Sequence, residues 1–196
     1  MKLYILRHED RTMDATLFSP LTENGLHASI KLIEILNGQE IDYIYSSPFI
    51  RTLQTIHPYT KFKKLKINIE HSLSEIQHPH IIPEKSFTIS LPKYIAKSFN
   101  YNKKYTSLLN PINHNYPEDE ESVNIRVKAF ISKIMNEHLD TKYNIILVTH
   151  QIICNAILKI ATKKNSDISI DITNNYMKGG LTCVFDTDKW VYKKIN

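Results

Sequence analysis

The run Asn144–Thr149 constrains the fold most strongly, because it contains four consecutive large apolar residues, Ile-Ile-Leu-Val. An apolar run without alternation is typical of a strand that is buried on both faces of a parallel sheet. A second run, Leu3–Leu6, is apolar and partly aromatic, and polar residues from His8 to Asp14 follow it at once. We therefore predict two buried strands that lie far apart along the chain.

Segments with helical character separate the predicted strands. Apolar residues keep helical spacing over Leu26–Leu36, and Asn37-Gly38 supplies a stop signal. Pro48 suits the first turn of another helix, which Pro58 is expected to end. Further strands are expected at Asp42–Tyr45, Ile67–Glu70, Thr182–Phe185 and Trp190–Tyr192, and further helices at Val123–Leu139 and Ile152–Ile160. Strands that alternate with helices predict an α/β fold whose largely parallel sheet is covered on both sides.

The segment 72–121 interrupts this alternation. Five prolines punctuate it, and only Lys93–Asn100 has convincing helical character. Irregular chain of this length inside a compact domain is more often an active-site cap or binding loop than filler. We predict a single domain over residues 1–196, with 72–121 as an inserted cap or substrate loop. Four aromatic residues could pack on a substrate or form a small core of the cap: Tyr94, Phe99, Tyr101 and Tyr105.

The composition limits the partners and the compartment. The net charge of +5 favours anionic partners, but the basic run Lys61–Lys66 is better explained as solvated chain than as a nucleic-acid patch. No stretch of about 18 apolar residues is found, so we expect neither a membrane span nor a membrane partner. The two cysteines, Cys154 and Cys183, lie in apolar surroundings, which favours a reducing, cytoplasmic location. Neither cysteine has an arginine six residues later, which argues against a cysteine-dependent phosphatase.

Two histidines follow the two buried strands directly. His8 stands beside Arg7 after the first strand, and His150 follows the run Asn144–Thr149. In an open α/β sheet, ligands bind beyond the carboxyl ends of the strands, where these side chains would lie. A neutral imidazole is a nucleophile near pH 7, and a guanidinium binds phosphate in a fixed fork geometry. Together with Arg51, which lies in the predicted second helix, these residues form a candidate anion site.

Six short motifs then occur in a familiar order. They are Leu6-Arg7-His8, Leu21-Thr22-x-x-Gly25, Ser46-Ser47-Pro48-x-x-Arg51-x-x-Gln54-Thr55, Leu73-x-Glu75, Glu121-Ser122 and Val148-Thr149-His150. In this order and over the stretch from Lys2 to about Ile160, the chain resembles the histidine phosphatase (phosphoglycerate mutase-like) superfamily. The resemblance implies a three-layer α/β/α sandwich and a phosphohistidine mechanism that uses neither a metal nor another cofactor.

The resemblance also implies a role for each matching residue. His8 would attack phosphorus and become transiently phosphorylated. Arg7, Arg51 and His150 would bind the phosphoryl oxygens, His150 as a donor or as a cation. Glu75 would protonate the leaving oxygen and later activate water. Arg11 stands where a second arginine reaches the phosphate in the acid-phosphatase branch of the superfamily.

The chain departs from the family pattern in two places. Glu9 replaces the glycine that usually follows the first histidine, and its carboxylate would repel phosphate unless it turns away or pairs with a cation, for which Arg11 is the obvious candidate. Gln151 follows His150, where the acid-phosphatase branch has an aspartate donor, so Glu75 is the better donor. The pattern over Arg7–Asp14, followed by Pro-Leu-Thr, is closer to the suppressor of T-cell receptor signalling phosphatases.

Three functions fit these residues. The leading one is hydrolysis of a phosphomonoester, either a phosphorylated small molecule or a phosphopeptide. The alternatives are a phosphoglycerate mutase-type phosphotransferase and a catalytically impaired relative that binds phosphorylated ligands, which Glu9 makes plausible. His71, His78 and His80 are candidate zinc ligands, but they lie in a loop without cysteine partners, so no metal site is expected.

Overall fold

A six-stranded sheet forms the centre of the protein, in the strand order β3-β2-β4-β1-β5-β6. The computed structural model describes residues 1–14, 16–83, 97–138, 141–164, 177–188 and 191–195. The strands are β1 (Lys2–Arg7), β2 (Tyr43–Ser46), β3 (Ile67–Ile69), β4 (Asn144–Thr149), β5 (Gly180–Asp186) and β6 (Val191–Lys194). The pairs β1–β4, β4–β2 and β2–β3 are parallel, whereas β5 runs antiparallel to both of its neighbours. The sheet is therefore mixed but mostly parallel.

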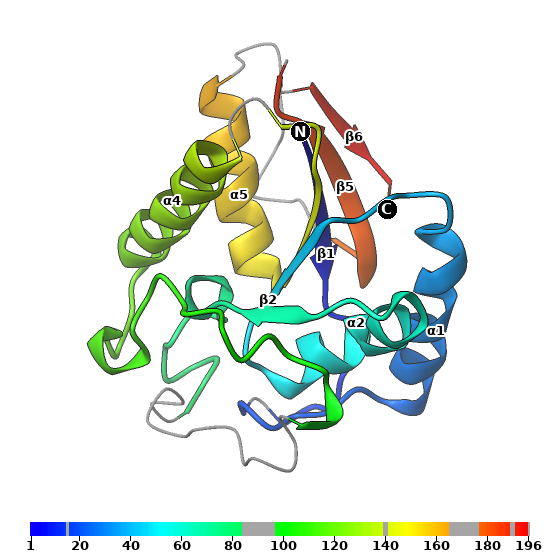
Figure 1. Ribbon diagram of the computed structural model, residues 1–196. Coiled ribbons are helices and arrows are strands. Elements are labelled where there is room, and N and C mark those ends of the chain that lie inside the picture. The colour runs from blue at the N-terminus through cyan, green and yellow to red at the C-terminus, as the bar shows by residue number, and fades with distance from the viewer. Residues whose placement is uncertain (15, 84–96, 139–140, 165–176, 189–190, 196) are drawn as a thin grey trace.

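Helices cover both faces of this sheet, as Figure 1 shows. The α-helices among the described residues are α1 (Glu23–Ile35), α2 (Ile50–Lys63), α4 (Glu120–Glu137) and α5 (Gln151–Lys164). In Figure 1, α1 and α2 lie on one side of the sheet and α4 and α5 on the other. The predicted α/β fold, a three-layer α/β/α sandwich with a mostly parallel sheet, is confirmed.

The two central strands divide their side chains between two hydrophobic clusters. Leu3 and Ile5 belong to the cluster of α4 and α5, whereas Tyr4 and Leu6 belong to the cluster of α1 and α2. In β4, Ile145 and Leu147 alternate in the same way with Ile146 and Val148. Because successive side chains of a strand point to opposite faces, a strand between two helical layers must be apolar throughout. This requirement explains the unbroken apolar runs.

Helix α1 approaches the loop after β1 through its smallest residues. Its buried positions are Gly25, Ser29 and Leu32, while Leu26 and Ile30 remain 41% and 55% exposed. A Cβ at Gly25 would lie 2.1 Å from the carbonyl oxygen of Asp10, far inside van der Waals contact. The apolar residues that predicted the helix therefore do not all face the core, because close approach to this loop requires small side chains.

The loop and α1 are also joined by hydrogen bonds. Thr22, the N-cap of α1, accepts a bond from the Gly25 amide at 3.1 Å. Its own amide donates to the carbonyl of Asp10 at 3.0 Å, and its hydroxyl donates to the Asp10 carboxylate at 2.7 Å. The Leu-Thr-x-x-Gly motif thus supplies a helix cap and a contact that holds the loop carrying His8 and Arg11.

The predicted end of the second helix at Pro58 is wrong. Helix α2 begins at Ile50, with Phe49 as N-cap and Pro48 just before it, and continues through Pro58 to Lys63. A proline inside a helix costs about 3 kcal/mol through the lost hydrogen bond and steric conflict. The turn after Pro58 carries Tyr59, which is fully buried in the cluster of α1 and α2. Burial of a large side chain contributes about 1.5–3 kcal/mol, so tertiary packing offsets the local penalty.

The described part of the segment 72–121 is irregular, as expected. It holds two 3₁₀ turns, η1 (His71–Leu73) at its start and η3 (Pro111–Asn113). The first half of the predicted helix Lys93–Asn100, including Tyr94, lies outside the described residues. Phe99 and Tyr105 pack on the main core: Phe99 joins the cluster of α1 and α2, and the Tyr105 ring lies 5.5 Å from the Tyr45 ring. These two aromatics are therefore used by the domain core.

The buried carboxylate of Glu70 attaches this segment to the end of β3. It accepts hydrogen bonds from the Tyr105 hydroxyl at 2.5 Å, from Ser107 Oγ at 2.8 Å and from the Leu108 amide at 3.0 Å. The amide of Ser72, at the start of η1, donates to the same carboxylate at 2.8 Å. Because all four donors bond to one buried carboxylate, residues 105–108 and η1 are held against the sheet.

Among the described residues, no helix is both long and apolar enough to cross a membrane.

The close approach at Gly25 predicts a large effect of a single methyl group. Gly25→Ala should lower the free energy of unfolding by about 1–3 kcal/mol, because overpacking forces the helix away from the Asp10 carbonyl. Gly38→Ala is the matched control: its Cβ would meet nothing within 4 Å, and only its φ of +78° opposes the change. Urea unfolding of both variants measures the difference. A loss at Gly25 no greater than at Gly38 would contradict the steric explanation.

Candidate functional site

Parallel pairing of β1 with β4 brings the two candidate histidines together. Arg7 pairs with Thr149 in the sheet register, and the amide of His8 donates to the carbonyl of Thr149 at 2.9 Å. The rings of His8 and His150 meet edge to face, with their centroids 5.2 Å apart. Both side chains are buried, at 5% and 0% exposure. Two residues that are 142 positions apart (150 − 8) therefore share one site.

The backbone selects one tautomer of His8. Its Nδ1 atom lies 2.8 Å from the carbonyl oxygen of Glu9. A carbonyl oxygen only accepts hydrogen bonds, so Nδ1 carries the proton and Nε2 keeps its lone pair. Burial, and then the positive charge of Arg51, lower the pKa of His8 to about 3. At neutral pH the ring is therefore uncharged, and Nε2 is the ring nitrogen with a free lone pair.

Arg51 supplies a buried positive charge from the first turn of α2. Its side chain is 1% exposed, Nη1 donates to the Thr16 carbonyl at 2.9 Å, and Cζ lies 4.5 Å from the centre of the Phe49 ring. Nε has no hydrogen-bond partner among the described residues. Burial lowers the pKa of the guanidinium to about 10, so the group stays cationic at neutral pH. A buried cation with an unused donor is a site for an anion.

Arg7, at the end of β1, is oriented by the segment that precedes β5. Its Nη1 donates to the carbonyl oxygen of Met177. The amide of Met177 in turn donates to Oε1 of Gln151 at 2.8 Å, and Gln151 is the first residue of α5. The segment before β5 thus connects the first arginine with the helix that follows His150. Sequence reasoning missed this contribution of Met177, because the interacting atom is a backbone carbonyl.

His150 is held between a hydroxyl and a carboxyl group. Its Nε2 lies 2.9 Å from Oγ of Ser47, and its Nδ1 lies 3.7 Å from Oε2 of Glu75. Burial lowers the pKa of His150 well below its ordinary value. Burial also raises the pKa of Glu75, although the charge of Arg51 acts in the opposite direction. Both groups are therefore driven toward their neutral forms, so of the two predicted forms of His150 the structure favours the neutral donor.

Glu75 reaches the site from the loop after η1. Its Oε1 accepts a hydrogen bond from the amide of Ile76 at 3.1 Å, and its side chain is buried. The hydroxyl of Thr149 donates to the carbonyl of Leu73 at 2.6 Å, which ties this loop to the end of β4. Burial of a carboxyl shifts its equilibrium toward the protonated form, which is the form able to give up a proton.

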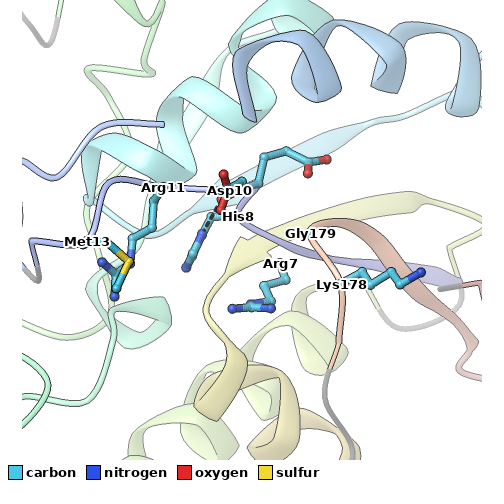
Figure 2. Close-up of a pocket in the computed structure, with 8 residues that line it drawn as sticks. Arg7, His8, Asp10, Arg11, Met13, Lys178 and Gly179 are labelled. Carbon is cyan, nitrogen blue, oxygen red and sulfur yellow. Dashed lines mark hydrogen bonds between the residues drawn. The ribbon is translucent and has the colours of Figure 1, made fainter. Parts of the chain in front are cut away.

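An open pocket of about 340 Å³ lies beside His8. It is lined by Arg7, His8, Glu9, Asp10, Arg11, Met13, Lys178 and Gly179. Figure 2 shows the side chains of Arg7, His8 and Arg11 directed toward one region, whereas Lys178 points away from them. The Arg11 guanidinium donates through Nη1 to the carbonyls of Thr12 at 2.6 Å and Asp14 at 3.0 Å. The sequence-predicted residues Arg7, His8, Arg11, Arg51, Glu75 and His150 therefore gather at one end of the sheet.

The predicted pairing of Glu9 with Arg11 is not formed. The Arg11 guanidinium is engaged by its own loop, and the Glu9 carboxylate lies against two glycines that precede and open β5. A Cβ at Gly179 would lie 2.4 Å from Oε2 of Glu9, and one at Gly180 would lie 2.6 Å from Oε1. Gly180 also has a φ of +84°, which favours glycine. Two glycines thus provide the space that the Glu9 carboxylate occupies.

The backbone of Glu9 accounts for the threonine of the Arg-x-x-Gln-Thr motif, Thr55, which serves as its hydrogen-bond partner. Its amide donates to Oγ1 of Thr55 at 2.9 Å, and the same hydroxyl donates to the carbonyl of Arg51 at 2.7 Å. Gln54 accepts a bond from the Leu21 amide through Oε1 at 2.8 Å. The motif therefore bonds α2 to both ends of the single loop that connects β1 with α1. The relative positions of His8 and Arg51 follow from these bonds.

The three histidines considered as zinc ligands do not form such a site. The rings of His78 and His80 stack at 5.0 Å, and burial lowers the pKa of His71 to about 4. Within the described ranges, no group of three or more His, Cys, Asp or Glu residues is arranged to hold a metal ion.

The α/β/α fold, with histidines and arginines gathered at the carboxyl ends of the central strands, defines a protein of the phosphoryl-transfer class. The family model described as histidine phosphatase superfamily (branch 1) matches residues 3–196. The chain belongs to the histidine phosphatase superfamily. No curated protein matches the sequence.

Solved structures show the same fold. The ecdysone phosphate phosphatase from Bombix mori superimposes with a TM-score of 0.75 and 15% identity, covering 100% of this chain and 92% of that chain. The α-ribazole phosphatase from Shigella flexneri superimposes with a TM-score of 0.69 and 17% identity, covering 100% of this chain and 95% of that chain. A phosphoglycerate mutase from Bacillus anthracis superimposes with a TM-score of 0.64 and 19% identity, covering 100% of this chain and 92% of that chain. Phosphatases and a mutase thus share this architecture, while the likeness to the suppressor of T-cell receptor signalling phosphatases stays a prediction.

The surroundings of Glu9 predict a pH-dependent contribution to stability. Burial raises its pKa from the ordinary 4.5 to about 7. The folded protein then binds a proton more tightly than the unfolded chain, so stability is lost as the pH rises from about 4.5 to about 7. The unfolding free energy of the wild type should fall relative to that of Glu9→Gln over this range, measured by urea unfolding at several pH values. A constant difference between the two proteins would show that the carboxylate is not desolvated.

Proposed function

We propose that the protein hydrolyses phosphomonoesters through a phosphohistidine formed on Nε2 of His8. One observation supports this proposal above the others: the Glu9 carbonyl holds the proton on Nδ1, so the free lone pair of Nε2 belongs to a buried, neutral ring. The site is completed by the buried cation of Arg51 and by His150. We assign the binding of the phosphoryl oxygens to Arg7, Arg51, His150 and, from the pocket rim, Arg11.

The first half of the reaction transfers the phosphoryl group to the protein. Nε2 of His8 forms a bond to phosphorus while the bond from phosphorus to the ester oxygen breaks. The proton of Glu75 moves to that oxygen, and a neutral alcohol leaves. Burial raises the pKa of this carboxyl and so favours the protonated form that a general acid needs. The positive charges compensate charge that shifts onto the leaving and phosphoryl oxygens in the transition state.

The second half regenerates the enzyme. Glu75, now ionised, takes a proton from a water molecule, whose oxygen attacks phosphorus. The bond from phosphorus to Nε2 breaks, inorganic phosphate leaves, and His8 returns to its neutral form. Every charge that the cycle needs is supplied by side chains of the site, so we propose a mechanism without a metal or another cofactor.

The position of Glu9 bears on the alternative functions. A catalytically impaired, ligand-binding relative was plausible because a carboxylate next to His8 would repel phosphate. The Glu9 residue lines the pocket, but its carboxylate lies against Gly179 and Gly180, and this placement supports hydrolysis over that alternative. For substrate we propose a phosphorylated small molecule, since the ecdysone phosphate and α-ribazole phosphatases that share the fold are named for such esters. Both cysteines are free and buried, which fits the cytoplasmic location that we infer.

Substitution of His8 tests the covalent step. His8→Ala should abolish hydrolysis of p-nitrophenyl phosphate and remove the acid-labile, base-stable phosphate that is trapped on the wild type, because the nucleophile is absent. Enzyme that has reacted with a radiolabelled phosphomonoester is quenched rapidly in an alkaline denaturant, and peptide mapping at alkaline pH then locates the label. His27→Ala, at an exposed position of α1, is the matched control and should retain both activity and label. Label on a serine or cysteine would overturn the mechanism.

Substitution of Glu75 tests the proton donor. Glu75→Gln keeps the shape of the side chain but removes the transferable proton. Since a general acid contributes about 10²–10⁴-fold, formation of the phosphoenzyme should slow by about that factor for alkyl phosphates. It should slow much less for p-nitrophenyl phosphate, whose leaving group departs without a proton.

Single-turnover rates are the appropriate measurement, because Glu75 also acts on water in the second half of the cycle. Glu34→Gln, an exposed carboxyl change on α1, is the control and should leave both rates unchanged. Equal slowing of phosphoenzyme formation for the two classes of leaving group would show that Glu75 only positions the substrate.

A further inference from the structure

A buried ion pair stands directly behind the loop that carries Glu75. Arg126 of α4 donates through Nε to Oε1 of Glu118 at 2.7 Å and through Nη2 to Oε2 at 3.0 Å. The two residues are 7% and 3% exposed. Paired, parallel bonds between a guanidinium and a carboxylate fix the relative orientation of both groups. Neither residue is part of the six motifs quoted above, and neither lies among the residues that line the pocket beside His8.

The pair holds the Glu75 loop on both sides of Glu75. On the N-terminal side, Nη1 of Arg126 donates to the carbonyl of Ser72 at 2.7 Å. On the C-terminal side, the amide of Gln77 donates to Oε2 of Glu118 at 3.1 Å, and the amide of Glu118 donates to the carbonyl of Gln77 at 2.7 Å. The loop from Ser72 to Gln77 is therefore fixed at both ends by two side chains that form one rigid unit.

The Glu118–Arg126 pair, called the clamp below, fixes the carboxyl group of Glu75 through hydrogen bonds within the loop. Nε2 of Gln77 donates to the carbonyl of Glu75 at 3.0 Å, and the amide of Ile76 donates to Oε1 of Glu75 at 3.1 Å. The carboxyl thereby keeps Oε2 at 3.7 Å from Nδ1 of His150. Proton transfer requires the acid to stay within hydrogen-bond reach of the leaving oxygen, so a small displacement of this loop would slow protonation of the leaving group.

We infer that the Glu118–Arg126 pair is a positioning device for the general acid, and that both residues set the rate of protonation of the leaving group without touching substrate. This inference rests on the proposed function of Glu75. An ion pair that only stabilised the fold would influence all substrates equally. A pair that positions the acid influences a substrate in proportion to its need for a proton.

Removal of one partner alone would leave a buried charge without a counter-ion and endanger folding. The test therefore uses the double variant Glu118→Leu/Arg126→Met, which removes both charges and replaces them with apolar groups of similar length. Arg126→Lys is a second variant: it keeps the positive charge but cannot donate to Glu118 and Ser72 in the geometry of a planar fork. Ile134→Val, a change in the core of α4 away from the Glu75 loop, is the matched control for a loss of packing.

The first measurement is the dependence of single-turnover phosphoenzyme formation on the leaving group. Against p-nitrophenyl phosphate, the double variant should be within about threefold of the wild type, and against an alkyl phosphate it should be slower by about tenfold or more, as expected for partial loss of general acid catalysis. Combined with Glu75→Gln, the double variant should cause no further slowing, because the group that it positions no longer carries the proton. Arg126→Lys should show the same selective defect, and Ile134→Val should show none.

The second measurement does not depend on turnover. The Ile76 amide is bonded to the Glu75 carboxylate and to neither clamp residue, so its hydrogen-exchange protection reports the position of that carboxylate. Protection of Ile76 should fall by about tenfold in the double variant and remain unchanged in Ile134→Val at equal global stability.

The outcomes separate this inference from the proposed function. A folded double variant with unchanged leaving-group dependence, or with unchanged Ile76 protection, overturns the clamp while leaving the phosphohistidine mechanism intact. Equal slowing for both leaving groups also overturns it. A wild-type enzyme without His8-dependent hydrolysis overturns the proposed function, and exchange at Ile76 then decides whether the pair still positions the Glu75 carboxyl.

Discussion

The pairing of β1 with β4 is the constraint on which the site depends. Parallel strands end at the same edge of a sheet, so the residues that follow Arg7 and Thr149 emerge side by side. The bond from the His8 amide to the Thr149 carbonyl continues this ladder one residue beyond β1. Helices on both faces bury the two strands and also exclude water from their ends. The same pairing therefore creates the contact between the imidazoles and the desolvation that both of them experience.

Desolvation then decides the charge of each group in the site. It lowers the pKa of His8 to about 3 and of Arg51 to about 10, and it raises the pKa of Glu75. Because burial disfavours the charged form of every group, the same environment leaves an uncharged imidazole, a guanidinium that is still cationic at neutral pH, and a carboxyl shifted toward its protonated form. A phosphoryl dianion would enter a site whose positive charge comes mainly from arginine. The proposed attack and protonation require a neutral histidine and a protonated acid, and desolvation favours both forms.

Much of this arrangement could be predicted from sequence. The unbroken apolar runs predicted the buried strands, and the motifs that follow them predicted Arg7, His8, Arg51, Glu75 and His150 as neighbours. Expectations failed where a local rule competed with packing. Pro58 does not end α2, because the turn beyond it buries Tyr59. Glu9 does not pair with Arg11, because Gly179 and Gly180 leave space for its carboxylate and the Arg11 guanidinium bonds to nearby carbonyls.

The sequence by itself determined the fold class and the set of candidate site residues, because strand periodicity and short motifs are local properties that a single stretch of chain carries. Only the tertiary structure decided the protonation and support of those side chains. The tautomer of His8 depends on a backbone carbonyl, Arg7 is oriented by Met177, and Glu75 is held by a pair formed with α4. Backbone atoms are the same in every residue, and burial is a property of the whole packed chain. Neither leaves a signature in the residues that it controls.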